Sequence, residues 1–164
     1  MIPEIIKRRT IRQYSDKKVS EKDITEIIKA AQFAPTGMNT RVVEYIVVKD
    51  KKSKEQIAEI MNQKQFIKDA PILIIPVSDT TKSPLFIQDL SIASSYIQLQ
   101  AVACGLGSVW KHAYPDQVEK VKKLLHIPDN VTFINMLAIG YAKEKKDVHT
   151  DAEFDIKKIH HEQW

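Results

Sequence analysis

The longest helical stretch of the sequence is apolar on more than one side, which restricts the folds open to the chain. Residues 84–103 carry their apolar side chains in two stripes at helical spacing. One stripe contains Phe86, Leu90, Ala93 and Ile97, and the other Ile92, Tyr96, Leu99 and Ala103. A helix of this kind is normally buried on more than one side. We expect it to be the central helix, with the small residues around Ser94 at a subunit contact.

Shorter helices and strands alternate around this segment. Helical spacing predicts helices over residues 2–7, 21–34, 53–61 and 115–125, with Ser20 as the cap of the second. Segments rich in β-branched or apolar residues predict strands over 42–48, 72–77, 108–112 and 131–139. Pro76 in the second strand indicates an edge or a bulge. The tail carries Phe154 and Trp164, whose rings are expected to dock.

The chain is the size of one domain. Its 164 residues are enough to bury a substantial core without disulfides or metals. The alternation of elements predicts one α+β domain over residues 1–164, with a mixed sheet flanked by helices and a long central helix.

Composition disfavours several classes of partner. The chain has 25 Lys and Arg against 21 Asp and Glu, without the long basic and aromatic stripe of a nucleic-acid binder. No stretch approaches the length of a membrane span, and the N-terminus lacks a signal-peptide pattern. Cys104 is the only cysteine, so no intrachain disulfide can form. We expect a cytoplasmic protein that binds neither nucleic acid nor membrane.

Common catalytic motifs are absent from the sequence. It contains no G-x-S-x-G, no H-E-x-x-H and no Walker sequence, and its histidines lack the spacing of metal ligands, so no metal is expected. Cys104 lies in an apolar helical stretch, where a packed thiol is commoner than a nucleophile. Gly105-Leu106-Gly107 follows a helix instead of a strand, so Gly105 is interpreted as a helix C-cap and not as a dinucleotide fingerprint.

Two segments could bind a ligand. Arg8-Arg9-Thr10-Ile11-Arg12 offers three guanidinium groups and a hydroxyl, a donor set that suits phosphate. A second basic cluster, at Lys143, Lys145 and Lys146, could flank the same phosphate, although solvated basic faces are the better default on charge alone. Residues 34–41 form a loop with Pro, Gly and Asn between a helix and a strand, and in isolation predict only a turn.

Together these segments resemble the nitroreductase family of FMN-dependent oxidoreductases. The R-R-S-x-R-x-F-like motif of the family is matched by residues 8–14, and its A-P-S-x-x-N-x-Q-P-W-like motif by residues 34–41. Its Ala-Pro before an apolar strand is matched by residues 70–75, its G-L-G-s-x-W turn by residues 105–110, and the ending of short members by residues 154–164. The five motifs occur in the family's order over nearly the whole chain.

The resemblance implies a site shared by two subunits of a homodimer that binds FMN. Arg8, Arg9 and Thr10 would hold the phosphate and ribityl chain, and Arg12 would face the flavin N1 and C2 carbonyl. From the other subunit would come Pro35, Thr36, Gly37 and Asn39. The segment Trp110-Lys111-His112 would run along the flavin, and Lys145 or Lys146 would complete the phosphate site.

The implied activity is hydride transfer from NAD(P)H through FMN to nitroaromatics, quinones or similar small acceptors, by a ping-pong mechanism. No side-chain acid, base or nucleophile is required. The alternative is an FMN carrier or sensor of the same fold with little reductase activity. It is favoured by departures from the family pattern at Arg41, Ala113 and Glu153. The sequence names neither the acceptor nor the preferred nicotinamide.

Overall fold

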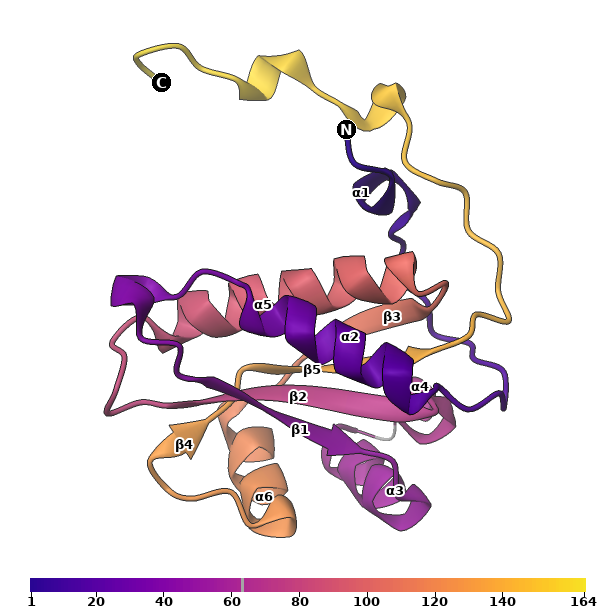
Figure 1. Ribbon diagram of the computed structural model, residues 1–164, viewed down its shortest axis with the longest axis vertical. Coiled ribbons are helices and arrows are strands. Elements are labelled where there is room, and N and C mark those ends of the chain that lie inside the picture. The colour runs from indigo at the N-terminus through magenta and orange to yellow at the C-terminus, as the bar shows by residue number, and fades with distance from the viewer. Residues whose placement is uncertain (63) are drawn as a thin grey trace.

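An antiparallel sheet lies between two layers of helices in the computed structural model, which describes residues 1–62 and 64–164 (Figure 1). The strands lie in the order β1 (Val43–Val48), β2 (Ile72–Asp79), β5 (Asn135–Gly140) and β3 (Gly107–His112), and the short β4 (Val131–Thr132) pairs with β2. One face is covered by α2 (Glu21–Gln32) and α5 (Phe86–Ala103). The other is covered by α3 (Lys51–Ile60), α4 (Gln65–Asp69) and α6 (Pro115–Leu125).

The remaining named elements are short. They are α1 (Pro3–Lys7) and three single-turn 3₁₀ helices, η1 (Gly37–Asn39), η2 (Asp151–Glu153) and η3 (Ile156–Lys158). The predicted α+β architecture is confirmed. The named strand pairs are all antiparallel, and a parallel contact is made by the bridge between Thr10 and Ser108 at the outer edge of β3.

Strand β2 supplies core residues to both layers. Leu73 and Ile75 pack toward α3, α4 and α6, whereas Ile72 and Ile74 pack toward α2 and α5. This alternation follows from the two-residue period of a strand, and it explains why the segment is apolar on both faces. The sequence-based prediction of a buried strand is therefore confirmed.

Pro76 marks a bulge and not an edge. Residues 72–74 pair with 139–137 of β5, and residues 78–79 pair with 132–131 of β4. Three residues of β2, 75–77, thus lie opposite four residues, 133–136. The irregularity coincides with Pro76, which has no N–H for the ladder. It also corrects the predicted strand 131–139, which is broken at Phe133 and Ile134 into β4 and β5.

Most helix boundaries agree with the local signals. The Ser20 hydroxyl caps α2 by accepting a hydrogen bond from the amide of Asp23 at 3.1 Å. Gly105 ends α5 with φ +73°, and the amide of Leu106 donates to Ala101 O at 2.8 Å, as expected of a glycine C-cap. Helix α4 was not predicted, because it has only five residues.

Burial of α5 differs from the expectation. Leu90, Ala93 and Ile97 are buried as predicted, but the second stripe is not covered, with Ile92 36% and Tyr96 38% exposed. Ser94, expected at a subunit contact, is buried within its own chain, where its hydroxyl bonds to Leu90 O and to Asn135. No helix in the described part of the chain is long and apolar enough to cross a membrane.

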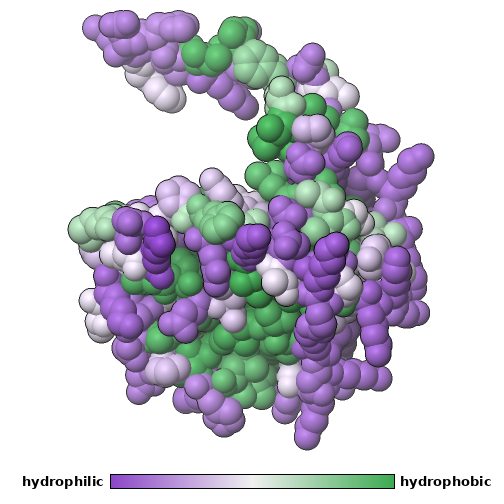
Figure 2. Space-filling view, in the orientation of Figure 1, coloured by the Kyte–Doolittle hydropathy of each residue, from purple (hydrophilic) through white to green (hydrophobic). Residues whose placement is uncertain are grey.

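The tail also differs from the expectation. Residues 147–164, here called the C-terminal arm, contact the N-terminal segment through Asp147, His149 and Glu153, and then extend away from the domain instead of docking on it (Figure 1). Phe154 and Ile156 are about two-thirds exposed and Trp164 is fully exposed. Figure 2 shows open space between the arm and the α5 side of the domain. Within the part of the chain that the structure describes, Phe154, Ile156 and Trp164 pack into no apolar surface.

Candidate functional site

The basic segment after α1 is held against the edge of the sheet. The amide of Ile11 donates to Ser108 O at 3.0 Å, and Tyr14 bridges to Ala142 beyond β5. The buried Tyr14 hydroxyl lies 2.6 Å from Ile11 O and 2.9 Å from Ala138 O. Burial is the main cause that raises the pKa of Tyr14, so this hydroxyl stays a neutral donor. Arg8, Thr10 and Arg12 are therefore presented on a fixed backbone.

Adjacent arginines lie in different surroundings. Arg8 lines a pocket against Ser95 and Leu99 of α5, where its Nη2 lies 3.5 Å from His149 Nε2. Arg9 lines a different groove, together with Lys145 and Lys146. Its Nη1 donates to Asp147 O at 2.6 Å and lies 4.0 Å from Glu153 Oε1. The structure thus brings the two predicted basic clusters together around Arg9, and it leaves Arg8 apart from the lysines.

Glu144, which the sequence did not single out, organises this region. Its Oε1 accepts hydrogen bonds from the amides of Arg12 and Gln13, and its Oε2 lies 3.0 Å from Lys146 Nζ. These contacts, with the Arg12 amide first, lower the pKa of the Glu144 carboxyl. Glu144 therefore ties the backbone at Arg12 to the segment after β5 and pairs with a lysine expected at the phosphate.

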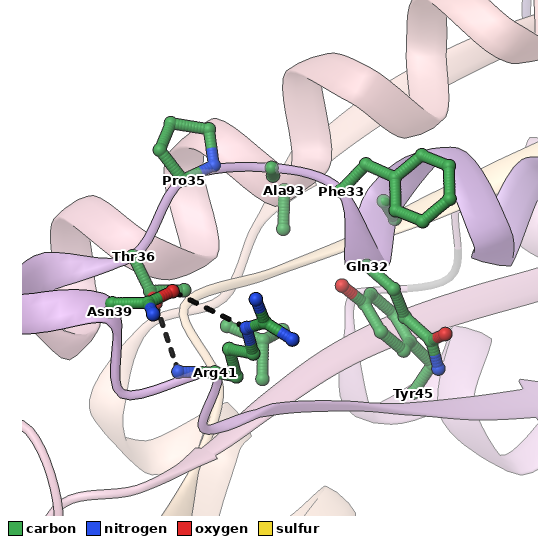
Figure 3. A pocket seen from close by; sticks show the side chains of 11 residues that line it. Gln32, Phe33, Pro35, Thr36, Asn39, Arg41, Tyr45 and Ala93 are labelled. Atoms are coloured by element: carbon green, nitrogen blue, oxygen red, sulfur yellow. Dashed lines mark hydrogen bonds between the residues drawn. The ribbon is translucent and has the colours of Figure 1, made fainter.

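The loop after α2 is held in an unusual conformation (Figure 3). Met38, Asn39 and Arg41 have φ of 51°, 53° and 50°, in the left-handed region that non-glycine residues rarely adopt. The Arg41 amide donates to Thr36 Oγ1 at 2.9 Å, and Arg41 Nε donates to Asn39 Oδ1 at 3.3 Å. Strained backbone of this kind persists only where surrounding contacts impose it.

Asp89 at the start of α5 supplies one of those contacts. Its carboxylate is buried and accepts hydrogen bonds from the Gly37 amide at 2.7 Å and from Ser83 Oγ at 2.9 Å. The sequence alone does not predict this role of Asp89. Gly37 lies 52 positions away along the chain, and Ser83 belongs to no recognised motif. Asp89 anchors the loop to the N-terminal end of α5.

We expect Asp89→Ala to lower the free energy of unfolding by about 3 kcal/mol, since it leaves a buried amide and hydroxyl without their charged acceptor. Urea denaturation measures this directly. Asp89→Asn, which keeps an acceptor oxygen in place, is the matched control and should lose less. A loss below about 1 kcal/mol for the alanine variant would contradict the anchoring role.

The two halves of the expected site lie at different positions along α5. The loop containing Pro35, Thr36, Gly37 and Asn39 contacts the helix at Asp89. Arg8 lies against Ser95 and Leu99 in the middle of the helix, and the backbone at Thr10 and Ile11 lies beside β3 just after Ala103. At 1.5 Å per residue, these helix positions are roughly 9 to 20 Å from Asp89. One chain therefore does not bring the two halves together.

The third predicted segment lies on strand β3, at the edge of the sheet. The rings of Trp110 and His112 stack with centroids 6.0 Å apart. The Lys111 ammonium donates to His112 O and lies 5.5 Å from the ring centroid of Tyr114, which packs edge-on against His112. The Ala113 amide donates toward the neighbouring segment of the chain, to Ile134 O. Successive residues of a strand direct their amides to opposite sides within the sheet, so the amides of Trp110 and His112 point away from β5. A ligand beside this edge can meet those two amides.

Comparison with known proteins identifies the family. The model of the nitroreductase family matches residues 5–79 and 61–141. This chain belongs to the nitroreductase family. The resemblance inferred from the five motifs is thereby confirmed.

Individual relatives match over almost the full chain. An FMN-dependent nitroreductase from Clostridium difficile R20291 has 34% sequence identity and a TM-score of 0.95, with 100% of each chain covered. A protein of Archaeoglobus fulgidus assigned as NADH dehydrogenase/NAD(P)H nitroreductase is 35% identical, over 98% of this chain and 96% of its own. An NAD(P)H-dependent FMN reductase of Bacillus subtilis is 26% identical, over 88% of this chain and 67% of its own.

No group of three or more side chains suited to a metal ion occurs among residues 1–62 and 64–164. Cys104 is partly buried, and burial is the main cause that raises the pKa of its thiol, as expected of a packed cysteine. The site is thus an array of cations, amides and aromatic rings along β3 and α5. Such an array is suited to holding an anionic, flat molecule.

Proposed function

We propose that this chain uses FMN to pass hydride from NAD(P)H to small electron-poor acceptors such as nitroaromatics and quinones, in a ping-pong sequence. Its family membership makes it an NAD(P)H-dependent oxidoreductase with FMN as cofactor. The acceptor class and the order of the steps are our proposal. The observation that carries it is the basic segment clamped beside the open edge of β3.

The residues present fit the chemistry of FMN. A phosphate binds guanidinium and hydroxyl donors well, and Arg8 and Thr10 offer one of each two positions apart on a fixed backbone. Arg8 has no carboxylate within 4.0 Å in the described part of the chain, whereas Arg9 is near Glu153 and Lys146 is paired with Glu144. We therefore assign the phosphate to Arg8 and Thr10. The alternative, a phosphate site at Arg9, Lys145 and Lys146, is tested against it below.

The chain's own residues bind and orient in this proposal. When bound, FMN accepts hydride from the nicotinamide and donates it to the acceptor. Arg12 would place a cation beside the pyrimidine edge of a bound flavin, where a fixed positive charge would favour added negative charge. The outward amides of Trp110 and His112 offer hydrogen bonds along the strand edge. NAD(P)H and the oxidised acceptor would occupy the same place one after the other, which defines a ping-pong mechanism.

A homodimer would complete the site. In the part of the chain that the structure describes, Ile92 and Tyr96 of α5 and the apolar side chains Phe154, Ile156 and Trp164 of the arm are exposed. If two copies of α5 pack antiparallel about a twofold axis, the N-terminal end of one helix meets the C-terminal end of the other. That arrangement would bring Pro35, Thr36, Gly37 and Asn39 of one subunit to Arg8, Thr10 and Arg12 of its partner.

An FMN carrier or sensor is the second candidate. It is favoured by the Glu153 carboxylate, which lies 2.7 Å from His149 Nδ1 and 4.0 Å from Arg9 within the basic region. A carboxylate there competes with a phosphate for the same cations, which would weaken cofactor binding. This candidate predicts a bound flavin that NAD(P)H does not reduce.

An absorption spectrum of the purified, dialysed protein tests the proposal, followed by anaerobic addition of NADH or NADPH. We expect flavin bands that bleach on addition and return when a nitroaromatic or quinone is supplied. Flavin bands that persist with both nucleotides would favour the carrier or sensor. Absence of flavin after incubation with FMN would contradict both candidates.

A further inference from the structure

His149 of the C-terminal arm lies in the pocket of Arg8, although the sequence did not assign it to the site. The arm passes beside α1 (Figure 1), and there the His149 amide donates to Ile6 O at 2.9 Å. The pocket has a volume of about 370 Å³. Besides Arg8 and His149 it is lined by uncharged residues, Ile5, Ser95, Gln98 and Leu99. An anionic group in this pocket would therefore meet the guanidinium and the imidazole together.

Contacts on both sides of the His149 ring determine where its proton lies. Nδ1 is 2.7 Å from Glu153 Oε2, and Nε2 is 3.5 Å from Arg8 Nη2. An ionised carboxylate only accepts hydrogen bonds, so Nδ1 carries a proton, whereas a guanidinium only donates, so Nε2 faces it best as an acceptor. The bond from His149 is the first of the causes that lower the pKa of the Glu153 carboxyl. Glu153 is therefore ionised near neutral pH and holds the proton on Nδ1.

A phosphate bound at Arg8 would change Nε2 from an acceptor into a donor. Charge-assisted hydrogen bonds are about 2.8 Å long, so two nitrogens 3.5 Å apart can both donate to one phosphate oxygen. Because Nδ1 keeps its proton on the Glu153 carboxylate, Nε2 can donate only from a doubly protonated, charged ring. The repulsion between that ring and Arg8 would be outweighed by the negative charge of the phosphate.

We propose that His149 is a further phosphate-binding residue, which takes up a proton as FMN binds and then donates to the phosphate through Nε2. The inference rests on the proposed function, in which the phosphate lies at Arg8. The charged groups around the ring are Arg8 after α1, Glu153 of η2 and, 4.0 Å from Glu153, Arg9. Helix α5 contributes uncharged side chains to the same pocket. An imidazole titrates close to neutral pH, so the affinity for FMN would depend on pH in that range.

The number of protons taken up per FMN tests the proposal without NAD(P)H. Calorimetric titration of the FMN-free protein with FMN at about pH 7.5, in Hepes and in Tris, gives this number from the difference between the two heats. We expect an uptake of roughly half a proton, because an imidazole is mostly neutral at that pH until a phosphate lies beside it. The second ionisation of a phosphate monoester lies near pH 6, so FMN bound as the dianion can only release protons. An uptake therefore comes from the protein.

Two substitutions at His149 separate charge from titration. His149→Gln removes the titratable group, and His149→Arg replaces it with a permanent cation. Both should abolish the proton uptake. At about pH 6.5 the glutamine variant should bind FMN about ten-fold more weakly, while the arginine variant should keep the affinity. His161→Gln removes an exposed imidazole from the same arm and should behave as the unmodified protein does.

The affinity for FMN should also fall as the pH rises, because the complex holds one proton more than the free protein. Between about pH 6.5 and 8.5 we expect the unmodified protein to weaken about ten-fold and both His149 variants to change by less than about three-fold. Fluorescence titration with FMN at each pH measures this dependence.

The possible outcomes separate this inference from the proposed function. No proton uptake by the unmodified protein, or an uptake that persists in His149→Gln, overturns the inference even if NAD(P)H reduces the flavin. Equal loss of FMN affinity in the glutamine and arginine variants overturns it too, since a permanent cation should restore binding. An uptake that depends on His149, with a flavin that NAD(P)H does not reduce, overturns the proposed function and leaves the role of His149 standing.

Discussion

Arg8→Ala is expected to weaken FMN binding by roughly 100-fold, because two charge-assisted hydrogen bonds to a phosphate contribute about 3 kcal/mol. Arg8 lies on the α5 side of the clamped segment, and its nearest polar partner is His149 at 3.5 Å. A phosphate placed there meets an uncompensated guanidinium with little competition from carboxylates. The dissociation constant can be measured by fluorescence titration of the FMN-free protein with FMN.

Arg9→Ala is the matched comparison, since it removes the same side chain from the next position. We expect its FMN affinity to stay within about three-fold of the unmodified protein, because Arg9 is already engaged by Asp147 O and faces Glu153. The reverse result, with the large loss at Arg9 and at Lys145 or Lys146, would move the phosphate to the other groove. If Arg8→Ala and Arg9→Ala both changed FMN affinity only slightly, both phosphate sites would be contradicted.

Tyr96→Asp is expected to separate the subunits and to release FMN in the same step. Tyr96 lies in the middle of the uncovered stripe of α5, so in the proposed dimer a carboxylate there would be buried without a partner. A desolvation cost of several kcal/mol corresponds to a dimer dissociation constant raised on the order of 1000-fold. Sedimentation equilibrium monitored at both protein and flavin wavelengths reports the two consequences together.

Gln56→Glu adds the same charge to an exposed position on α3, far from α5, and should leave both mass and flavin content unchanged. The far-ultraviolet circular dichroism of Tyr96→Asp should remain that of a folded domain, since the side chain is not part of the core. A folded monomer that retains FMN as tightly as the unmodified protein would show that one chain suffices for the site.

Much of the fold was predictable because its signals are local. Ser20 caps a helix through its own amide neighbours, Gly105 ends one through its left-handed backbone, and the apolar run at 72–77 reads as a buried strand. The predicted strand over residues 131–139 is wrong in its continuity, because the break between β4 and β5 depends on how they pair with β2 near Pro76. A register is a property of two segments, and neither segment alone displays it.

The candidate site divides in the same way. The residue types, the order of the motifs and the family were determined by the sequence alone, since guanidinium, hydroxyl and turn residues carry their chemistry wherever they lie. Only the tertiary structure separated Arg8 from Arg9, brought Lys145 and Lys146 to Arg9, and anchored the strained loop through Asp89. Local preferences act between near neighbours in the chain, whereas these arrangements are set by contacts between residues 52 to 141 positions apart.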